Sequence, residues 1–378
     1  MIYLDNAATT RMRPEVLEAM LPYLQDTFGN ASAGYALARQ AHGALDAARE
    51  QMRSALHAEK AREVYFTSGG TESDNWAIKG AALANRQKGR HIVTTAVEHH
   101  AVLETCEALE REGFSVTYLR PDGEGRICLA DIERAVRPDT VLVSVMWANN
   151  EVGTVNPVAE IGAFLRERGI LFHVDAVQAV GHLPIDVVQA KIDLLSLSAH
   201  KFHGPKGVGI MYARRGCAPE TYIDGGEQER GHRAGTENVA GIVGAAAAFA
   251  EAISERNEKA DRLCAMRDEI QSGLLKIPGS QVNGVTAPRL PGTLNMSFDG
   301  IDGQSLIFEL DLKGLAASSG SACASGSVDP SHVLLALGLP YKLAHGSLRL
   351  SLGRYNTPDE AEMIVRIVSD TVAELRSN

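Results

Sequence analysis

One lysine stands out because it ends a strongly apolar segment. Lys201 follows the apolar residues 192–198 and precedes the glycine-rich turn His203-Gly-Pro-Lys-Gly. A lysine at the end of such a strand is partly desolvated, which lowers the pKa of its amine and suits Schiff-base chemistry. An exposed lysine in a surface loop is an equally good interpretation of this segment alone.

A carboxylate ends the preceding apolar segment. Asp175 follows residues 170–174, and a strand, a crossover and a second strand account for the chain between Asp175 and Lys201. Adjacent strand ends would bring the two side chains together. Pyridoxal phosphate (PLP) requires this pair, because a lysine binds its carbonyl carbon and a carboxylate keeps its pyridinium nitrogen protonated. The alternative is that Asp175 caps a helix.

Two loops of small residues add a phosphate site and a thiol. In Phe66-Thr-Ser-Gly-Gly-Thr-Glu-Ser, the N–H groups of Gly70 and Thr71 can cradle a phosphate, although any strand-to-helix turn can be glycine-rich and no Walker A lysine follows. Cys323 lies in the run Ala317-Ser-Ser-Gly-Ser-Ala-Cys-Ala-Ser-Gly, whose side chains can bury almost nothing. We predict a mobile loop with an exposed, nucleophilic thiol; a flexible linker with an incidental cysteine is the alternative.

Arg349 is a candidate substrate clamp. It lies between apolar neighbours in Ser347-Leu-Arg-Leu-Ser, whose alternation predicts a half-buried strand. Its guanidinium can bind a carboxylate with two hydrogen bonds. The segment alone favours the other interpretation, an arginine on an edge strand that faces solvent.

The other cysteines and the histidines match no standard metal site. The remaining cysteines are Cys106, Cys128, Cys217 and Cys264. The odd total and the absence of a Cys-x-x-Cys pair argue against a disulfide framework and a cysteine-based zinc site. The histidines near candidate strand ends are His99, His100, His200 and His203. Their spacing matches no zinc ligand set, so stacking on an aromatic cofactor is the better functional interpretation.

The composition excludes other classes of protein. With 378 residues, 45% apolar residues and a net charge of −10 without a basic block, the chain is typical of a globular protein of two domains and unsuited to nucleic acid. The N-terminus has no secretory signal pattern, and the most apolar run, 241–253, is shorter than the ~20 residues of a membrane span. We expect a cytoplasmic protein.

Strand-like and helix-like segments alternate through the middle of the chain. The predicted strands are residues 64–67, 91–95, 116–119, 141–147, 170–174, 192–198 and 208–212. Near-continuous apolar strands separated by helices indicate an α/β fold with a mostly parallel seven-stranded sheet covered on both faces. Ligands bind such sheets at the carboxyl ends of the strands.

The pattern changes towards the C-terminus. Residues 238–275 are expected to form one long helix or two, and residues 292–298 and 346–352 alternate like antiparallel strands. We expect a large cofactor-binding domain and a small α+β domain that carries the Cys323 loop. The expected boundaries are 15–255 for the large domain, and 1–14 with 256–378 for the small one.

Together these segments resemble the cysteine desulfurases of the NifS/IscS type, which are fold-type I, class-V aminotransferase-like PLP enzymes. The motifs follow the family's order over nearly the whole chain, and those around Lys201 and Cys323 are highly specific. The matching stretches are Tyr3-Leu-Asp-Asn-Ala-Ala-Thr-Thr, Phe66-Thr-Ser-Gly-Gly-Thr-Glu-Ser-Asp-Asn, Glu98-His99, Ala148-Asn-Asn-Glu-Val-Gly, His173-Val-Asp-Ala-Val-Gln, Ser198-Ala-His-Lys-Phe-His-Gly-Pro-Lys-Gly, Arg233-Ala-Gly-Thr-Glu-Asn, Ser318-Ser-Gly-Ser-Ala-Cys-Ala-Ser and Ala344-His-Gly-Ser-Leu-Arg-Leu-Ser-Leu-Gly-Arg.

Two motifs depart from the family pattern. Asn30-Ala-Ser-Ala-Gly-Tyr stands where the family often has Asn-Pro-Ser-Ser-x-His, and Gly225-Gly-Glu-Gln-Glu replaces Gly-Gly-Gly-Gln-Glu. Neither involves Lys201 or Cys323. They leave open the details of the active-site entrance and the physiological sulfur acceptor.

The resemblance implies a role for each matching residue. Lys201 would hold PLP covalently, Asp175 would pair with its pyridinium nitrogen, and His99 would stack on the ring and transfer protons. The other implied cofactor-binding residues are Gly70, Thr71, Asn150, Gln178, Ser198 and His200, with Thr236 reaching the phosphate bound in the other subunit of a homodimer. Asn150 would also help position the substrate, whose carboxylate Arg349 would hold.

The implied reaction removes sulfur from L-cysteine and gives L-alanine and a persulfide on Cys323. The sulfur would pass to an iron–sulfur scaffold protein or another acceptor, and Cys323 could transiently ligate an iron–sulfur cluster without any intrinsic metal site. A transaminase or selenocysteine lyase of the same fold and a non-catalytic sulfur-binding module are the alternatives. A transaminase has no need of Cys323, and a pseudoenzyme should have lost Lys201 or Asp175. Nitrogenase maturation, housekeeping cluster assembly and tRNA thiolation all fit as pathways.

Overall fold

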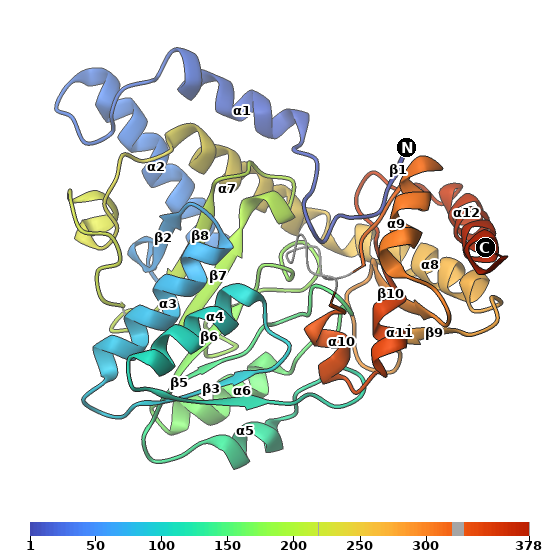
Figure 1. Ribbon diagram of the computed structural model, residues 1–378. Coiled ribbons are helices and arrows are strands. Elements are labelled where there is room, and N and C mark those ends of the chain that lie inside the picture. The colour runs from blue at the N-terminus through green and yellow to red at the C-terminus, as the bar shows by residue number, and fades with distance from the viewer. Residues whose placement is uncertain (218, 320–328, 378) are drawn as a thin grey trace.

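The structure is a computed structural model that describes residues 1–217, 219–319 and 329–377 (Figure 1). The predicted nucleophile Cys323 lies outside the described residues. Within them, no helix is both long and apolar enough to cross a membrane.

A seven-stranded sheet forms the centre of the larger part. Its strands are β2 (Val64–Thr67), β3 (His91–Thr95), β4 (Ser115–Leu119), β5 (Thr140–Ser144), β6 (Leu171–Asp175), β7 (Leu194–Ser198) and β8 (Gly209–Ala213). They lie in the order β2-β8-β7-β6-β5-β3-β4, and β8 alone runs in the direction opposite to the other six strands. Every residue of β3, β5 and β7 is buried, as continuous apolar runs require in a sheet covered on both faces. The predicted sheet is confirmed.

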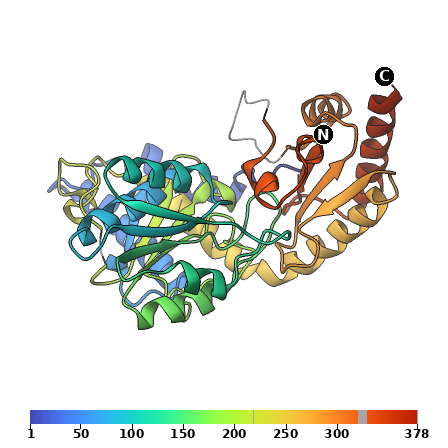
Figure 2. The same ribbon diagram turned by 60° about the horizontal axis from the view of Figure 1, so that its bottom comes forward.

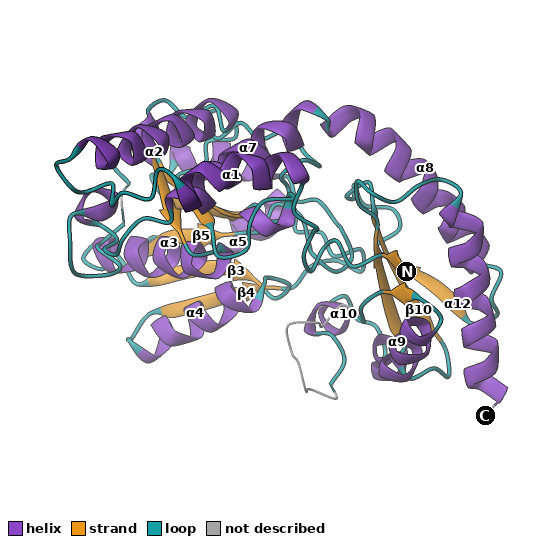
Figure 3. Ribbon diagram, turned by 90° about the horizontal axis from the view of Figure 1, so that it is seen from above, coloured by secondary structure: helices purple, strands orange, loops and turns teal. Residues whose placement is uncertain are grey.

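Helices cover both faces of this sheet (Figure 3). The helices of one face are α3 (Gly70–Asn85) and α4 (His100–Arg111), and those of the other are α2 (Ala36–Ala55), α5 (Leu129–Ala135), α6 (Val158–Glu167) and α7 (Val239–Ser254), with α1 (Pro14–Gln25) packed outside α7. Successive strand residues point to opposite faces, so Ile92 packs under α3 and α4 while Val93 joins the core on the other face.

A three-stranded antiparallel sheet forms a second core (Figure 2). Its strands lie in the order β12 (Ser347–Ser351), β10 (Thr293–Phe298), β9 (Ser280–Asn283). The helices beside it are α8 (Arg256–Leu274), α9 (Gly303–Leu312) and α12 (Glu360–Ser377), and the short helices α10 (His332–Ala336) and α11 (Tyr341–His345) precede β12. The first strand of the chain, β1 (Ile2–Tyr3), also lies in this region, where it pairs with β11 (Leu315–Ala316).

The long helical segment that follows the large sheet is two helices. α7 ends at Ser254 and α8 begins at Arg256, with Glu255 between them. Glu255 accepts hydrogen bonds from Arg13 and Arg354, so two distant parts of the chain are tied to the junction. α8 then leads from the large sheet to the small one (Figure 1).

We propose that the two cores belong to separate domains with the predicted boundaries, and unfolding can test this division. Phe298 is 0% exposed in the small core, whereas Phe308 in α9 is 63% exposed. Phe298→Ala should destabilise the small domain by about 3–5 kcal/mol because it leaves a cavity. Phe308→Ala, the matched control, should change stability by no more than about 0.5 kcal/mol.

Urea unfolding measures both effects. The protein has two tryptophans, and Trp76 and Trp147 both pack in the large part, so their fluorescence reports on that part alone. In Phe298→Ala the circular dichroism transition should begin at lower urea than the fluorescence transition. Coincident, equally shifted transitions would contradict the two-domain division.

Candidate active site

A cavity of about 640 Å³ opens at the carboxyl ends of β6 and β7. The predicted site residues that line it are Gly70, Thr71, His99, Asn150, Asp175, Gln178, Ser198, His200, Lys201 and Arg349. They come from six separate stretches of chain, and both sheets contribute. This is the edge at which parallel α/β sheets bind ligands.

Lys201 lies in the 3₁₀ turn Ala199–Lys201 that directly follows β7. Its Nζ donates hydrogen bonds to the carbonyl oxygens of Ala7 and Ala8, at 2.6 and 2.7 Å. The side chain is half-buried, so the interpretation as a solvated loop lysine is wrong. The N-terminal segment therefore holds the amine at the cavity wall.

Asp175 ends β6 and is 5% exposed. Burial raises the pKa of this carboxyl to about 6, while the N–H of Val177 and the charge of Lys201 oppose the rise. The Val177 N–H donates to Asp175 Oδ1 at 2.9 Å, as it would to a helix cap. A turn follows Asp175 instead of a helix, so the residue is not a helix cap. At pH 7 the carboxylate form prevails beside the lysine.

His99 is the N-cap of α4, where its Nδ1 accepts a hydrogen bond from the Ala101 N–H at 3.1 Å. Burial, followed by the charge of Lys201, lowers the pKa of the imidazole to about 4. The ring is therefore neutral at pH 7. Because Nδ1 is the acceptor, the ring proton belongs on Nε2.

The start of α3 offers an anion site at the cavity. Backbone N–H groups and the helix dipole at Gly70 and Thr71 favour a negative group there. A Cβ at Gly70 would lie 2.9 Å from Val177 Cγ2, so the first residue of α3 favours glycine. Ser198 and His200 line the same cavity, and His200 Nδ1 lies 3.1 Å from Thr9 Oγ1.

Arg349 lies in the middle of β12 and is 2% exposed. Its Nη2 donates to Asp5 Oδ1 at 2.7 Å, and Nη1 donates to the carbonyl oxygen of Asn150 at 3.1 Å. The interpretation as a solvent-facing edge arginine is wrong, because the N-terminal segment and the Asn150 loop cover this edge of the small sheet. Arg349 links the small sheet to the large one.

Two sequence-predicted residues are not seen in this cavity. Thr236 is exposed and lines a separate cavity of about 130 Å³. Cys323 lies outside the described residues, but the chain approaches its segment at Ser318, whose backbone pairs with that of Arg349. The chain resumes beside the site as well, where Ser331 donates to the buried carboxylate of Glu151.

Several contributors to the site were not singled out from the sequence. Asp5, the carbonyl groups of Ala7 and Ala8, and the buried acids Asp74 and Glu98 all lie at or below the cavity. All five residues, Asp5, Ala7, Ala8, Asp74 and Glu98, fall inside motifs that carry the family resemblance, which is the available signal. Their roles depend on contacts with distant parts of the chain.

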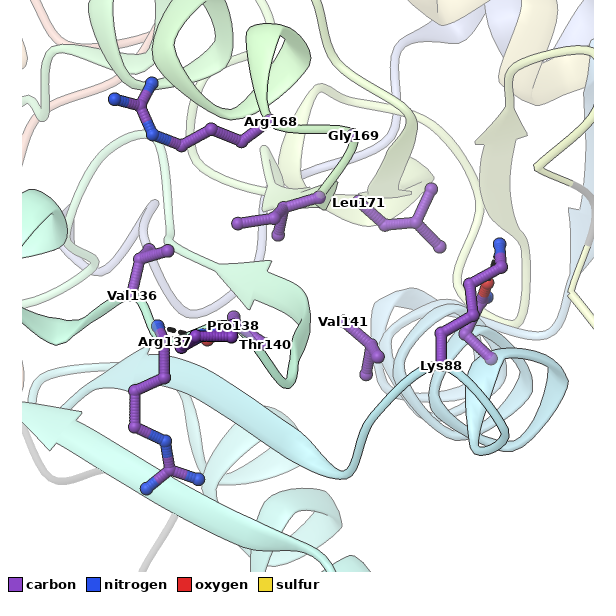
Figure 4. A pocket seen from close by; sticks show the side chains of 11 residues that line it. Lys88, Val136, Arg137, Pro138, Thr140, Val141, Arg168, Gly169 and Leu171 are labelled. Atoms are coloured by element: carbon purple, nitrogen blue, oxygen red, sulfur yellow. Dashed lines mark hydrogen bonds between the residues drawn. The ribbon is translucent and has the colours of Figure 1, made fainter.

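A second cavity, of about 500 Å³, lies at the amino ends of β5 and β6, at the other end of the strands from the first cavity (Figure 4). Its centre is apolar, with Val141 and Leu171, while Arg137 and Arg168 point away from it (Figure 4). None of the predicted site residues lies there. Among the residues that the structure describes, no three His, Cys, Asp or Glu side chains are grouped to hold a metal ion.

The first cavity fits a PLP-sized group. It combines a lysine amine, a buried carboxylate, a neutral histidine and a helix start suited to phosphate. The aspartate and lysine flank adjacent strand ends, since Asp175 is in register with Ser196 of β7. These are the chemical groups that the cofactor requires.

Comparison with known proteins gives consistent relatives. The Aminotransferase class-V family model matches residues 2–364. "Cysteine desulfurase IscS" of Methanosarcina thermophila is 52% identical over 376 residues, covering 100% of this chain and 93% of the relative. The protein of that name from Clostridium botulinum strain Hall is 50% identical, covering 99% and 95%.

Solved structures agree. A structure described as a NifS-like protein has a TM-score of 0.93 and 39% identity, covering 99% of this chain and 100% of that chain. One described as SspA in complex with cysteine has a TM-score of 0.83 and 36% identity, covering 94% and 100%. The chain therefore belongs to the class-V aminotransferase family and, within it, to the cysteine desulfurases of the NifS/IscS type.

Proposed function

We propose that this protein is a cysteine desulfurase that uses PLP to convert L-cysteine to L-alanine and leaves the sulfur as a persulfide on Cys323. The observation that carries the proposal is the meeting of Lys201, Asp175 and Arg349 at one cavity. The names of its relatives and the cysteine complex of a related structure support the substrate.

Residues from several elements that line the cavity would hold the cofactor. Lys201 would bind its carbonyl carbon, Asp175 its ring nitrogen, Gln178 its ring hydroxyl, and His99 would stack on the ring. The phosphate-binding residues would be Gly70, Thr71, Ser198 and His200. When bound, PLP withdraws electrons from the substrate carbon next to the amine.

Arg349 and Asn150 would orient the substrate. The guanidinium is fixed by Asp5 and by the Asn150 carbonyl before any substrate arrives. Within the described residues its Nε has no hydrogen-bond partner although it is buried, so one donor remains for a substrate carboxylate. Fixing the carboxylate in this way fixes the direction in which the cysteine side chain points.

Sulfur transfer is a displacement at the substrate sulfur. The Cys323 thiolate attacks that sulfur and forms the S–S bond, while the electron pair of the broken C–S bond stays with carbon, which gains a proton and becomes the methyl group of alanine. His99 is neutral and holds its ring proton on Nε2, so this N–H can donate a hydrogen bond, and the ring would have to take up a proton before it could act as a general acid. No other oxidant or reductant is needed.

We also propose a cytoplasmic homodimer that passes its sulfur to an iron–sulfur scaffold protein or another acceptor. Thr236 is exposed and does not line the cavity described above, which suits a residue that completes the other subunit's phosphate site. The net charge of −10 favours a protein or small-molecule acceptor over nucleic acid.

Borohydride reduction of the PLP-loaded protein should fix the cofactor to a peptide that contains Lys201, because its amine is held at the wall of the cavity that Asp175 also lines. Peptide mass spectrometry measures the label. Lys201→Ala should carry no label, and Lys88→Ala, at the far cavity, should be labelled like the wild type. Cofactor fixed to another lysine would refute the assignment.

Cys323→Ser should retain the PLP absorbance but lose sulfide release from L-cysteine by roughly 10³-fold or more, because the sulfur acceptor is removed. Cys128→Ser, which alters an exposed cysteine of the large part, should leave the rate unchanged. Persistent sulfide release by Cys323→Ser would mean that another nucleophile acts.

Arg349→Gln should lower kcat/KM for L-cysteine by roughly 10- to 100-fold, the effect of about 1–3 kcal/mol for a charge-assisted pair. The loss for L-cysteine methyl ester, which has no carboxylate, should be much smaller. Steady-state kinetics with both substrates measures the ratio. An equal loss for acid and ester would show that Arg349 does not bind the carboxylate.

A further inference from the structure

Three buried carboxyl groups converge beneath the cavity. Asp74 of α3 is 1% exposed, Asp175 is 5% exposed and Glu98, which precedes α4, is 0% exposed. Burial raises the pKa of both other acids, and the charge of Asp175 adds to the rise in each, so the three groups interact. Three negative charges in one low-dielectric region are prohibitively unfavourable, and some of the acids must keep their protons.

A neutral hydrogen-bonded chain runs beside Asp74. His173 Nε2 lies 3.0 Å from Ser196 Oγ, and Nδ1 lies 2.8 Å from Ser144 Oγ. The same Nε2 is 3.6 Å from Asp74 Oδ1. Burial lowers the pKa of His173 to about 3, so the imidazole is uncharged and does not neutralise Asp74 by an ion pair.

The surroundings of Asp74 and Asp175 differ in the donors that they offer. Asp175 Oδ1 accepts the Val177 N–H, and Lys201 lies close by. Asp74 Oδ1 accepts no hydrogen bond in the described part of the chain. Burial, then the charge of Asp175, raises the pKa of Asp74 well above its usual value, against a smaller opposing effect of Ser196.

The third acid also favours its protonated form. Glu98 Oε1 accepts hydrogen bonds from Thr95 Oγ1 at 2.8 Å and from the Met146 N–H at 2.9 Å. Burial nevertheless raises its pKa to about 8, against an ordinary value of 4.5. The titratable groups around Asp74 are thus Asp175, His173 and Glu98, with Lys201 beyond Asp175.

We propose that Asp74 is a positioning residue of the cofactor site, which keeps a proton at neutral pH and, with Ser196 and His173, leaves the single negative charge of the acid cluster on the Asp175 carboxylate. Asp175 is in register with Ser196 on the adjacent strand, so the neutral chain lies directly beside the charged group. This inference rests on the proposed function, because that charge acts on a bound pyridinium nitrogen.

Two substitutions test whether Asp74 acts as a neutral polar side chain or as a negative charge. Asp74→Asn keeps a neutral polar group of the same shape, and Asp74→Ala removes it. The dissociation constant of PLP from the apo-protein at pH 7 should stay within about threefold of wild type for Asn and rise roughly tenfold for Ala, which loses the hydrogen bond between Asp74 and Ser196. The midpoint of the pH titration of the bound cofactor's absorbance should move in Ala and not in Asn.

Each other outcome overturns the inference. Equal weakening by Asn and Ala would mean that Asp74 acts as a charge, and an unchanged Ala variant would mean that it has no role. A wild-type apo-protein that fails to bind PLP would instead refute the proposed function. Thermal unfolding of the apo-proteins shows whether each variant folds.

Infrared difference spectroscopy reports directly on the proton of the Asp74 carboxyl group and does not depend on the Ala variant. At pH 7 the wild-type spectrum minus that of Asp74→Asn should contain a protonated-carboxyl C=O band that shifts in D₂O. Glu98→Gln, the matched control, should lose a separate band of the same kind. Loss of a carboxylate band in Asp74→Asn would refute the inference.

Discussion

The rest of this structure depends on holding one amine beside one buried carboxylate at the ends of two adjacent parallel strands. Asp175 ends β6, and Lys201 follows β7 by a single 3₁₀ turn. A carboxylate in this buried position would be unfavourable by itself, and the Val177 N–H and the charge of Lys201 offset part of its desolvation. β6 and β7 are parallel and are joined by a crossover connection, residues 176–193, that contains no helix, so both groups lie at the same edge of the sheet.

The first ten residues complete this arrangement from outside the large sheet. Leu4 is buried in the small core, and the next residues extend across to the large one. Asp5 binds Arg349, the carbonyl of Ala7 accepts from both Gln178 and Lys201, and Thr10 Oγ1 donates to the carbonyl of His200. One short segment therefore aligns Arg349, the proposed substrate clamp, with Lys201, the proposed cofactor lysine.

Sequence reasoning predicted what is local or periodic and failed where distant segments meet. Each strand of the large sheet was predicted because an apolar run has to be buried on both faces, and the loops after these strands contain their own glycines and acids. The contact of Lys201 with Ala7 spans 194 residues of chain, and that of Arg349 with Asp5 spans 344. No local pattern contains such pairs, so Arg349 was best interpreted as solvent-facing when it is in fact buried.

The same limit applies to the break between α7 and α8, because the sequence alone does not decide between one long helix and two. Residues 238–275 contain no proline and no glycine near the break. The junction coincides with Glu255, where Arg13 and Arg354 converge from the two ends of the chain. A half-buried carboxylate shared by two guanidiniums stabilises one orientation of α8 relative to α7. Because α8 packs on the small sheet that carries Arg349, this junction contributes to the placement of Arg349 relative to Lys201. A cluster outside the cavity thus acts together with the N-terminal segment, which contacts both residues directly.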